Sequence, residues 1–255
     1  MLSERNLYRL LPNIIYYCST KTFYMKKILL ALLLLMGVSV YSQQKNVYVQ
    51  YTALIHDETG LYGQNDFLRR TLEDALASTM SFGLVIKNKD AKFYNETYNS
   101  PTLNGDKEMI DLSLLLFAEY GGVNYTLDNM VYNQHVNSGV STYTKSGGVN
   151  NWTISKETKL INGRLCQKAT TFFVVKNKLG VYNHPVTAWY CTELNYSFGP
   201  IGYGNLPGLI TELTVRNVTY TLATIDEAST KDFDTKFLAT QKIQSQEEFD
   251  REIGG

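Results

Sequence analysis

The stretch from Gly199 to Leu213, GPIGYGNLPGLITEL, constrains the fold most, because it sets several chain breakers directly against an apolar run. Pro200 and Pro207 lack a backbone N–H and fix φ near about −65°. Glycines supply positions where φ can be positive or where another backbone can come close; they are Gly199, Gly202, Gly204 and Gly208. The chain is therefore expected to turn sharply twice while it stays buried.

The role expected for Asn205 to Ile210 within this stretch is structural. Pro207 sets a turn, and Gly208 takes a positive φ or permits a close contact. Three apolar side chains are expected to anchor the turn in the core: Leu206, Leu209 and Ile210. The stretch contains no histidine, cysteine or serine. It therefore predicts architecture and gives no indication of catalysis.

The N-terminal region has the layout of a secretory signal peptide. A basic MKK segment begins at Met25, an apolar run covers 28–40, and Val40 and Ser42 are the small residues expected before a cut at Gln43. A membrane-spanning helix needs roughly 20 apolar residues. The shorter run is therefore interpreted as a leader, with an N-terminal anchor as the alternative.

This interpretation divides the chain into three parts. Residues 1–24 are an over-extended start or a long leader, residues 25–42 are the signal peptide, and residues 43–255 are a single β domain. No cysteine follows the apolar run, so lipid attachment there is not expected. The product is expected to be exported to the periplasm or outside the cell, with no transmembrane span in the mature chain.

The composition favours strands and argues against nucleic acid as a partner. The chain carries 24 basic and 24 acidic side chains, without the basic stripe that nucleic-acid binding needs. Aromatic residues make up 13% of it, and 19 of them are tyrosines, which are enriched in strands. We predict an all-β fold with minor helix: a curved antiparallel sheet or half-closed barrel, with short helical segments near residues 66–77 and 235–252.

Alternating apolar and polar residues, separated by turn residues, predict the individual strands. They are expected over residues 45–53, 80–87, 91–98, 123–134, 140–143, 160–175, 186–194, 211–215 and 218–223, with turns at 88–90, 162–163 and 216–217. Residues 66–77 fit a helix or a polar loop, residues 112–120 fit a strand or a helix, and residues 99–111 are expected to form a mobile loop.

Two cysteines follow the leader, Cys166 and Cys191. A hairpin centred near Lys178 and Leu179 would place them opposite each other on neighbouring strands. An even pair in an exported protein favours a disulfide, which would stabilise the fold by roughly 3 kcal/mol. Two free buried thiols are the alternative, because a cross-strand bond needs a particular Cα spacing.

Four segments occur together in order: W-x-I at Trp152, ETKLINGRLCQKA at Glu157–Ala169, AWYCTEL at Ala188–Leu194 and GPIGYGNLPGLITEL at Gly199–Leu213. Their order and spacing resemble the GLPGLI family of exported Bacteroidetes proteins. Asn205 stands where the family hexapeptide begins with Gly, and Asn tolerates a left-handed backbone best among the other residues. The family has no established biochemical activity. The resemblance implies a fold similar to the bowl-shaped N-terminal domain of a bacterial peptide:N-glycosidase, used as an accessory module.

The sequence offers little support for catalysis, and no catalytic residue, metal site or cofactor is expected. His184 alone among the histidines could join Glu193 or Glu212 in a cleft, and a surface histidine at a turn is the alternative. Neither HExxH nor CxxC occurs. Aromatic side chains could line a sugar or peptide groove, with core packing as the alternative; they are Trp152, Trp189, Tyr190 and Tyr203.

The functional hypothesis is an exported, non-catalytic binding or accessory module of the bacterial cell envelope. Its partner would be an unknown envelope protein, a peptide or an apolar ligand. An outer-membrane assembly or transport helper is the alternative. A glycan or peptide hydrolase with Glu193 or Glu212 as acid or base is a third hypothesis.

Overall fold

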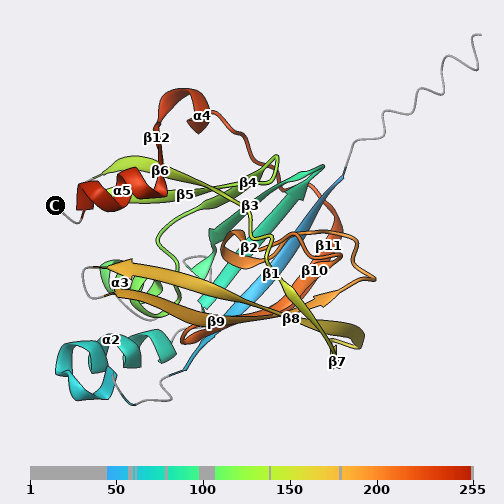
Figure 1. The fold of residues 1–255 in the computed structure, drawn as a ribbon, viewed down its shortest axis with the longest axis horizontal. Helices are drawn as coiled ribbons and strands as arrows, with labels where there is room; N and C mark the ends of the chain where they lie inside the picture. Colours follow the sequence, from blue (N-terminus) through green and yellow to red (C-terminus); the bar gives the residue numbers. More distant parts are fainter. Residues whose placement is uncertain are drawn as a thin grey trace, which may run out of the picture. The chain divides into compact units, whose positions relative to one another are not determined.

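The strands predicted from the sequence join into one sheet in the computed structural model, which describes residues 45–56, 60, 62–77, 80–97, 107–137, 139–177 and 180–253 (Figure 1). Within these residues the sheet has 12 strands in the order β12-β6-β5-β4-β3-β2-β1-β11-β10-β9-β8-β7. The predicted leader and its cleavage site lie outside the described residues. So does most of the loop expected over 99–111.

The bounds of the strands are β1 Asn46–Ile55, β2 Met80–Lys87, β3 Asp90–Asn95, β4 Asn124–Leu127, β5 Met130–Asn137, β6 Val140–Gly147, β7 Thr153–Ile161, β8 Arg164–Asn177, β9 Gly180–Cys191, β10 Leu209–Val215, β11 Val218–Ser229 and β12 Lys242–Ser245. The prediction of an all-β fold with minor helix is confirmed. Neighbouring strands run antiparallel except β12, which pairs with β6 in parallel. The sheet is mixed at that one pair, because the C-terminal segment returns alongside β6.

Asn-containing turns fix the hairpins. Asn88, between β2 and β3, and Asn162, between β7 and β8, have φ of 59° and 49°, the left-handed values that tight hairpin turns require. Asp128 and Asn129 have φ of 47° and 65° and divide the strand expected over 123–134 into β4 and β5. This last turn was not predicted from the sequence, although its residues are typical of one.

The helices are short, and two of them settle ambiguous patterns in the sequence. They are η2 Tyr62–Gln64, α2 Asp66–Ala77, α3 Lys107–Phe117, η4 Pro200–Gly202, α4 Phe237–Thr240 and α5 Gln246–Ile253. The helix option for 66–77 is confirmed, with Asn65 Oδ1 accepting hydrogen bonds from the first helical N–H groups. In α3 the side chains of Ile110, Leu114 and Phe117 are buried at helical spacing. The tail expected to be helical divides into α4, β12 and α5.

The main core lies between the sheet and α3. Phe82 and Phe93 stack at 5.3 Å on neighbouring strands, and Tyr220 packs edge-on against Phe82 at 5.1 Å. The Tyr220 hydroxyl donates to the backbone carbonyl of Ala118 at the end of α3. A second, smaller core joins Phe237 of α4 to tyrosines of β4, β5 and β6, which are Tyr125, Tyr132 and Tyr143. The β4–β6 part of the sheet therefore has packing of its own.

Residues 199–210, called the corner below, form a buried connection between β9 and β10. Leu206, Leu209 and Ile210 are at most 2% exposed. Gly208 lies so close to β9 that a Cβ there would be 2.6 Å from the carbonyl carbon of Cys191. Positive φ is found elsewhere in the corner, at Ile201, Gly202 and Asn205. Gly208 therefore provides close approach between backbones.

Candidate functional site

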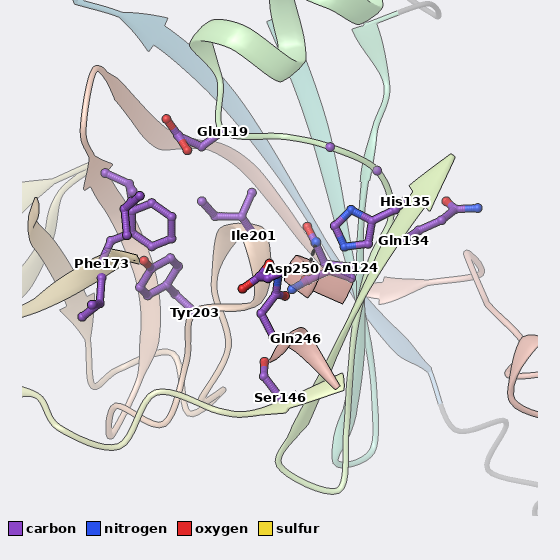
Figure 2. Close-up of a pocket in the computed structure, with 16 residues that line it drawn as sticks. Glu119, Asn124, Gln134, His135, Ser146, Phe173, Ile201, Tyr203, Gln246 and Asp250 are labelled. Carbon is purple, nitrogen blue, oxygen red and sulfur yellow. Dashed lines mark hydrogen bonds between the residues drawn. The ribbon is translucent and has the colours of Figure 1, made fainter. Parts of the chain in front are cut away.

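A cavity of about 500 Å³ lies where the corner and β8 approach the β4–β6 part of the sheet (Figure 2). Its lining comes from the segment before β4 (Glu119, Gly121, Gly122), from β4, β5 and β6 (Asn124, Asn133, Gln134, His135, Ser146), from β8 (Phe173, Val174, Val175), from the corner (Ile201, Tyr203), from β10 (Val215) and from α5 (Gln246, Asp250). Segments far apart in the sequence therefore build it together.

One wall of the cavity is apolar and rigidly supported. Ile201 has a φ of 45°, which is unusual for a β-branched residue and marks a backbone held by its surroundings. The Tyr203 ring packs 6.0 Å from the Trp152 ring, and Trp152 Nε1 donates to the carbonyl of Gly204 at 2.9 Å. Burial raises the pKa of Tyr203. The Tyr203 hydroxyl is therefore neutral at physiological pH.

The opposite wall carries amides, and one of them has an unused acceptor. Asn124 is 8% exposed, and its Nδ2 donates to Asn133 Oδ1 at 2.8 Å. Asn124 Oδ1 has no hydrogen-bond partner, the one such buried side-chain polar atom in the described part of the chain. Buried polar atoms are nearly always paired, so each exception calls for an explanation.

The titratable groups around the cavity already have partners. Glu119 forms an ion pair with Arg216 at 2.8 Å, and burial raises the pKa of Glu119 while Arg216 opposes that shift. Burial lowers the pKa of His135, and Asp250 opposes the shift. The His135 ring stacks on Phe249 of α5 at 4.0 Å. Asp250 accepts a hydrogen bond from Gln246.

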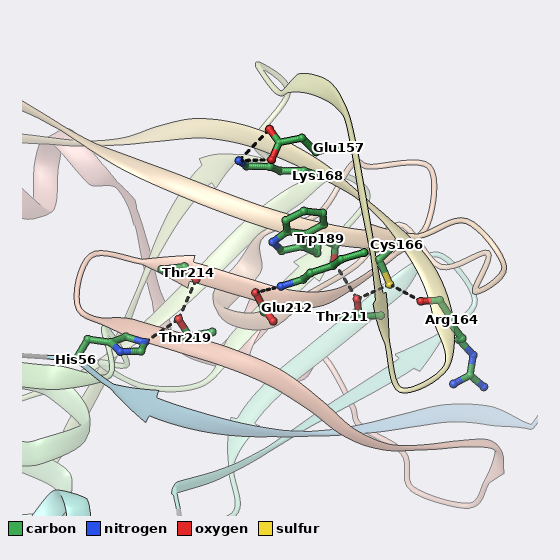
Figure 3. Close-up of polar contacts among 11 residues, drawn as sticks. His56, Glu157, Arg164, Cys166, Lys168, Trp189, Thr211, Glu212, Thr214 and Thr219 are labelled. Carbon is green, nitrogen blue, oxygen red and sulfur yellow. Dashed lines mark hydrogen bonds and ion pairs between the residues drawn. The ribbon is translucent and has the colours of Figure 1, made fainter.

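The predicted aromatic residues do not line one groove. Tyr203 lines the cavity and Trp152 supports it from behind. Tyr190 is 2% exposed, and its hydroxyl donates to Gln167. Trp189 lies on the outer face of the sheet, with the Lys159 ammonium 4.4 Å from its ring centre (Figure 3).

The two cysteines lie opposite each other as predicted, but they are free. Gln167, which follows Cys166, pairs with Tyr190, which precedes Cys191. This register corresponds to a hairpin centred at 178–179. Both thiols are fully buried. The expected disulfide is therefore wrong: Cys166 Sγ lies 3.2 Å from Thr211 Oγ1 and 3.5 Å from the Arg164 carbonyl, which occupy its hydrogen-bonding directions (Figure 3). Burial raises the pKa of Cys166, and Cys191 raises it further.

The structure does not bring together the residues named for a hydrolase. Glu212 is on the outer face of the sheet, paired with Lys159 at 2.7 Å. His184 is on β9 beside Phe173, with ring centres 6.4 Å apart. Glu193 is exposed in the turn after β9. None of the three lines the cavity.

The amide wall was not predicted from the sequence. A signal was available, since a hairpin turning at Asp128 and Asn129 places Asn124 directly opposite Asn133. Paired asparagines near the end of a hairpin are unusual for a core. The apolar wall on β8 and the corner could not be added from that pattern, because it lies on strands far along the chain.

The described residues set two further limits on the site. No three His, Cys, Asp or Glu side chains among them lie close enough to hold a metal ion. None of the described helices has the length and apolar character needed to cross a membrane.

Comparisons with known proteins give a structural likeness only. No family model matches the sequence, and no curated protein matches it. Two solved structures of PNGF-II, in space groups C2 and P21, are similar at TM-scores of 0.46 and 0.47, with 14% and 15% identity, over 79% and 81% of this chain. The matched region spans 31% and 33% of PNGF-II, about a third of its length. The resemblance to the GLPGLI family stays a prediction.

Proposed function

We propose that this chain is an exported, non-catalytic binding or accessory module of the bacterial cell envelope, and that its ligand occupies the cavity between the corner and the β4–β6 strands. The unpartnered Asn124 Oδ1 carries the proposal. A buried acceptor without a donor costs about 1–3 kcal/mol. A ligand N–H or O–H that reached this oxygen would remove that cost. Export rests on the signal-peptide layout before Gln43.

The lining favours a neutral or cationic ligand. The cavity volume of about 500 Å³ is typical of small-molecule and peptide sites. Among the described lining residues there is no lysine or arginine, whereas Glu119 and Asp250 are acidic. An anion would therefore meet no favourable charge. A molecule with one apolar face and several donors fits between Tyr203 and Asn124.

The partners of the titratable groups favour binding over catalysis. A general acid or base must be able to reach a substrate proton. Glu119 is held by Arg216, and Asp250 by Gln246. His135 Nε2 lies 3.0 Å from Thr144 Oγ1. These groups fix the shape and charge of the cavity walls.

Outer-membrane assembly or transport is the second candidate function. Exposed apolar side chains at the far end of the β8–β9 hairpin favour it, since such patches often mark protein interaction sites. Phe172, Val174 and Val181 are 60%, 47% and 61% exposed. A protein partner at this hairpin would suit either function.

The experiment fills the cavity with a large side chain at Ser146, a half-buried lining residue on β6. Wild-type protein and Ser146→Trp are screened by ligand-observed NMR against a fragment set of neutral, cationic and anionic compounds. Thr158→Trp, on exposed β7, is the matched control. We expect neutral or cationic fragments to bind wild type and the control, and to lose binding on Ser146→Trp. The proposal would be contradicted if fragments bound Ser146→Trp as well as they bind wild type, or if no fragment bound at all.

A further inference from the structure

β8 extends past the end of its neighbour β7. The last β7–β8 pair is Thr153↔Thr170, whereas the β8–β9 pairing continues to Asn177↔Gly180. Within the described residues, the 171–177 part of β8 therefore has a strand on one side only. Its other side is an open edge.

The hairpin register shows which backbone groups point outward along this edge. Two residues separate Asn177 from Gly180, and the pair that closes such a hairpin is hydrogen-bonded. Hydrogen-bonded and non-bonded pairs alternate from there. Phe172 and Val174 fall at non-bonded positions, so their N–H and C=O groups point away from β9. Pro185 opposite Phe172 fits this pattern, since that position needs no N–H.

The two outermost strands of the sheet are protected against strand addition, and this edge is not. β7 has an irregular register between Ile154 and Thr158, where Lys156 and Glu157 are exposed. β12 is only 4 residues long. Bulges, charges and shortness are the usual means of blocking an edge. Residues 171–175, TFFVV, carry no charge.

The open edge borders the cavity. Phe173, Val174 and Val175 all line it, although successive side chains of a strand point to opposite faces. Three consecutive residues can share one cavity only if it meets the strand along its edge. On the facing strand β5 the corresponding edge is already occupied, because the Gln134 N–H donates to the Val123 carbonyl at 2.9 Å.

We propose that an extended peptide segment of a partner protein binds as an added strand along Phe172–Val175, with inward side chains entering the cavity. This inference rests on the proposed function and names the ligand class. A peptide supplies alternating N–H and C=O groups for the open edge, and an amide N–H is the donor that Asn124 Oδ1 lacks. The described lining has no lysine or arginine, and the carboxylate of Asp250 favours an uncharged or basic segment over an acidic one.

The test uses a blocked eight-residue peptide of alternating valine and threonine with a C-terminal lysine amide. A second peptide of the same sequence carries N-methyl groups on alternate amides, which removes those main-chain donors. Both are titrated against the full chain by NMR, with amide exchange read at Phe172 and Val174. Val174→Pro removes one outward N–H, Val174→Thr keeps it, and Lys156→Pro on the β7 edge is the matched control.

We expect the unmethylated peptide to bind and to slow exchange at Phe172 and Val174. Val174→Pro should weaken it by roughly tenfold or more, since it removes a main-chain bond and blocks the added strand. Lys156→Pro should bind as wild type, Val174→Thr should bind more tightly than Val174→Pro because it keeps the outward N–H, and the methylated peptide should not bind. An acidic version with glutamate at the threonine positions should bind more weakly.

Three outcomes would overturn the inference: equal binding of the methylated peptide, no effect of Val174→Pro, or protection of Phe172 and Val174 in the free protein that grows with protein concentration. The last would show that the edge pairs with a second copy of this chain. Fragment binding that is lost on Ser146→Trp, without peptide binding at Val174, would keep the cavity as a ligand site and reject the added strand alone. Failure of both would reject the proposed function as well.

Discussion

The corner at 199–210 and the end of β8 at 171–177 use apolar residues in opposite ways. In the corner, backbone groups are paired within the fold: the Leu209 and Ile210 N–H groups donate to Leu194 and Phe198 at 2.9 and 3.0 Å, and the Tyr51 hydroxyl reaches the Ile210 carbonyl at 2.6 Å. Along β8 the apolar side chains are exposed and one row of backbone groups points outward. The comparison separates apolar residues that stabilise the fold from apolar residues left available for a partner.

Both regions line the cavity, so the difference in their backbone pairing bears on ligand binding. Ile201 and Tyr203 of the corner lie on the same wall of the cavity as Phe173 of β8 (Figure 2). A fixed wall sets the shape of the site, while an open edge supplies backbone groups that can still be paired. Binding sites commonly combine a rigid scaffold with a segment of low local stability.

The largest effect is expected at Gly208. Gly208→Val would place a branched side chain against the backbone of Cys191 and Thr192, atoms that cannot move aside without shifting β9. We expect it to lower the free energy of unfolding by about 3 kcal/mol or more, measured by urea denaturation. Gly147→Ala, where a Cβ meets open space, is the control and should change it by less than about 0.5 kcal/mol. Wild-type stability of Gly208→Val would show that the corner is not tightly packed.

An intermediate effect is expected at Asn205. Its φ is 61°, and its Nδ2 donates to the Val149 carbonyl at 3.1 Å and to Asn150 Oδ1 at 2.9 Å. Asn205→Ala loses these bonds and strains the backbone, so we expect a loss of about 2 kcal/mol in unfolding free energy. Asn205→Gly loses the bonds alone and should cost about half as much. Equal losses in the two variants would mean that the left-handed backbone contributes nothing.

Smaller changes are expected from pH at the cavity. Because the folded-state pKa of His135 is lowered, its contribution to stability is complete above the unfolded pKa of about 6.5 and is lost as pH falls through that value toward the folded pKa. His135→Gln should flatten this part of the pH profile. Asp250→Asn should steepen it, since Asp250 opposes the shift. Glu119 acts in the opposite sense, because its raised pKa favours the folded state as pH falls. A thermal-melt series from about pH 7.5 to about pH 5 measures the slopes; identical slopes in wild type and both variants would contradict this account.

The smallest effect is expected along the open edge. In the free protein, Val174→Pro removes an N–H that has no strand partner, so we expect it to cost less than about 1 kcal/mol. Leu213→Pro, inside β10 with strands on both sides, should instead cost more than about 3 kcal/mol. Chemical denaturation compares the two variants. A large loss of unfolding free energy for Val174→Pro would show that the 171–177 part of β8 is paired on both sides.

Local patterns in the sequence predicted much of the fold. Alternation and turn residues identified most strands, and the hairpin centre at 178–179 placed Cys166 opposite Cys191. The free thiols could not be foreseen, because they depend on the position of Thr211 on a third strand. Helical spacing fitted α2, whereas the apolar run of α3 also fitted a strand until packing against the sheet decided between them.

The candidate site was harder to predict than the fold. Tyr203 was named from the sequence, but Asn124 and Ser146 were not, because their importance comes from lying opposite β8 and the corner. An unpaired acceptor is a property of the assembled structure: only the packed neighbours show that Asn124 Oδ1 has no donor. The open edge of β8 likewise depends on where β7 begins, which the strand pattern alone did not fix.

Native-state hydrogen exchange tests the central contrast most directly, by comparing the amides of Ile210 and Val174 in the free protein. The account predicts that Ile210 exchanges only through global unfolding, while Val174 exchanges faster by several orders of magnitude because its N–H has no partner. Equal protection of the two amides at low protein concentration would contradict it.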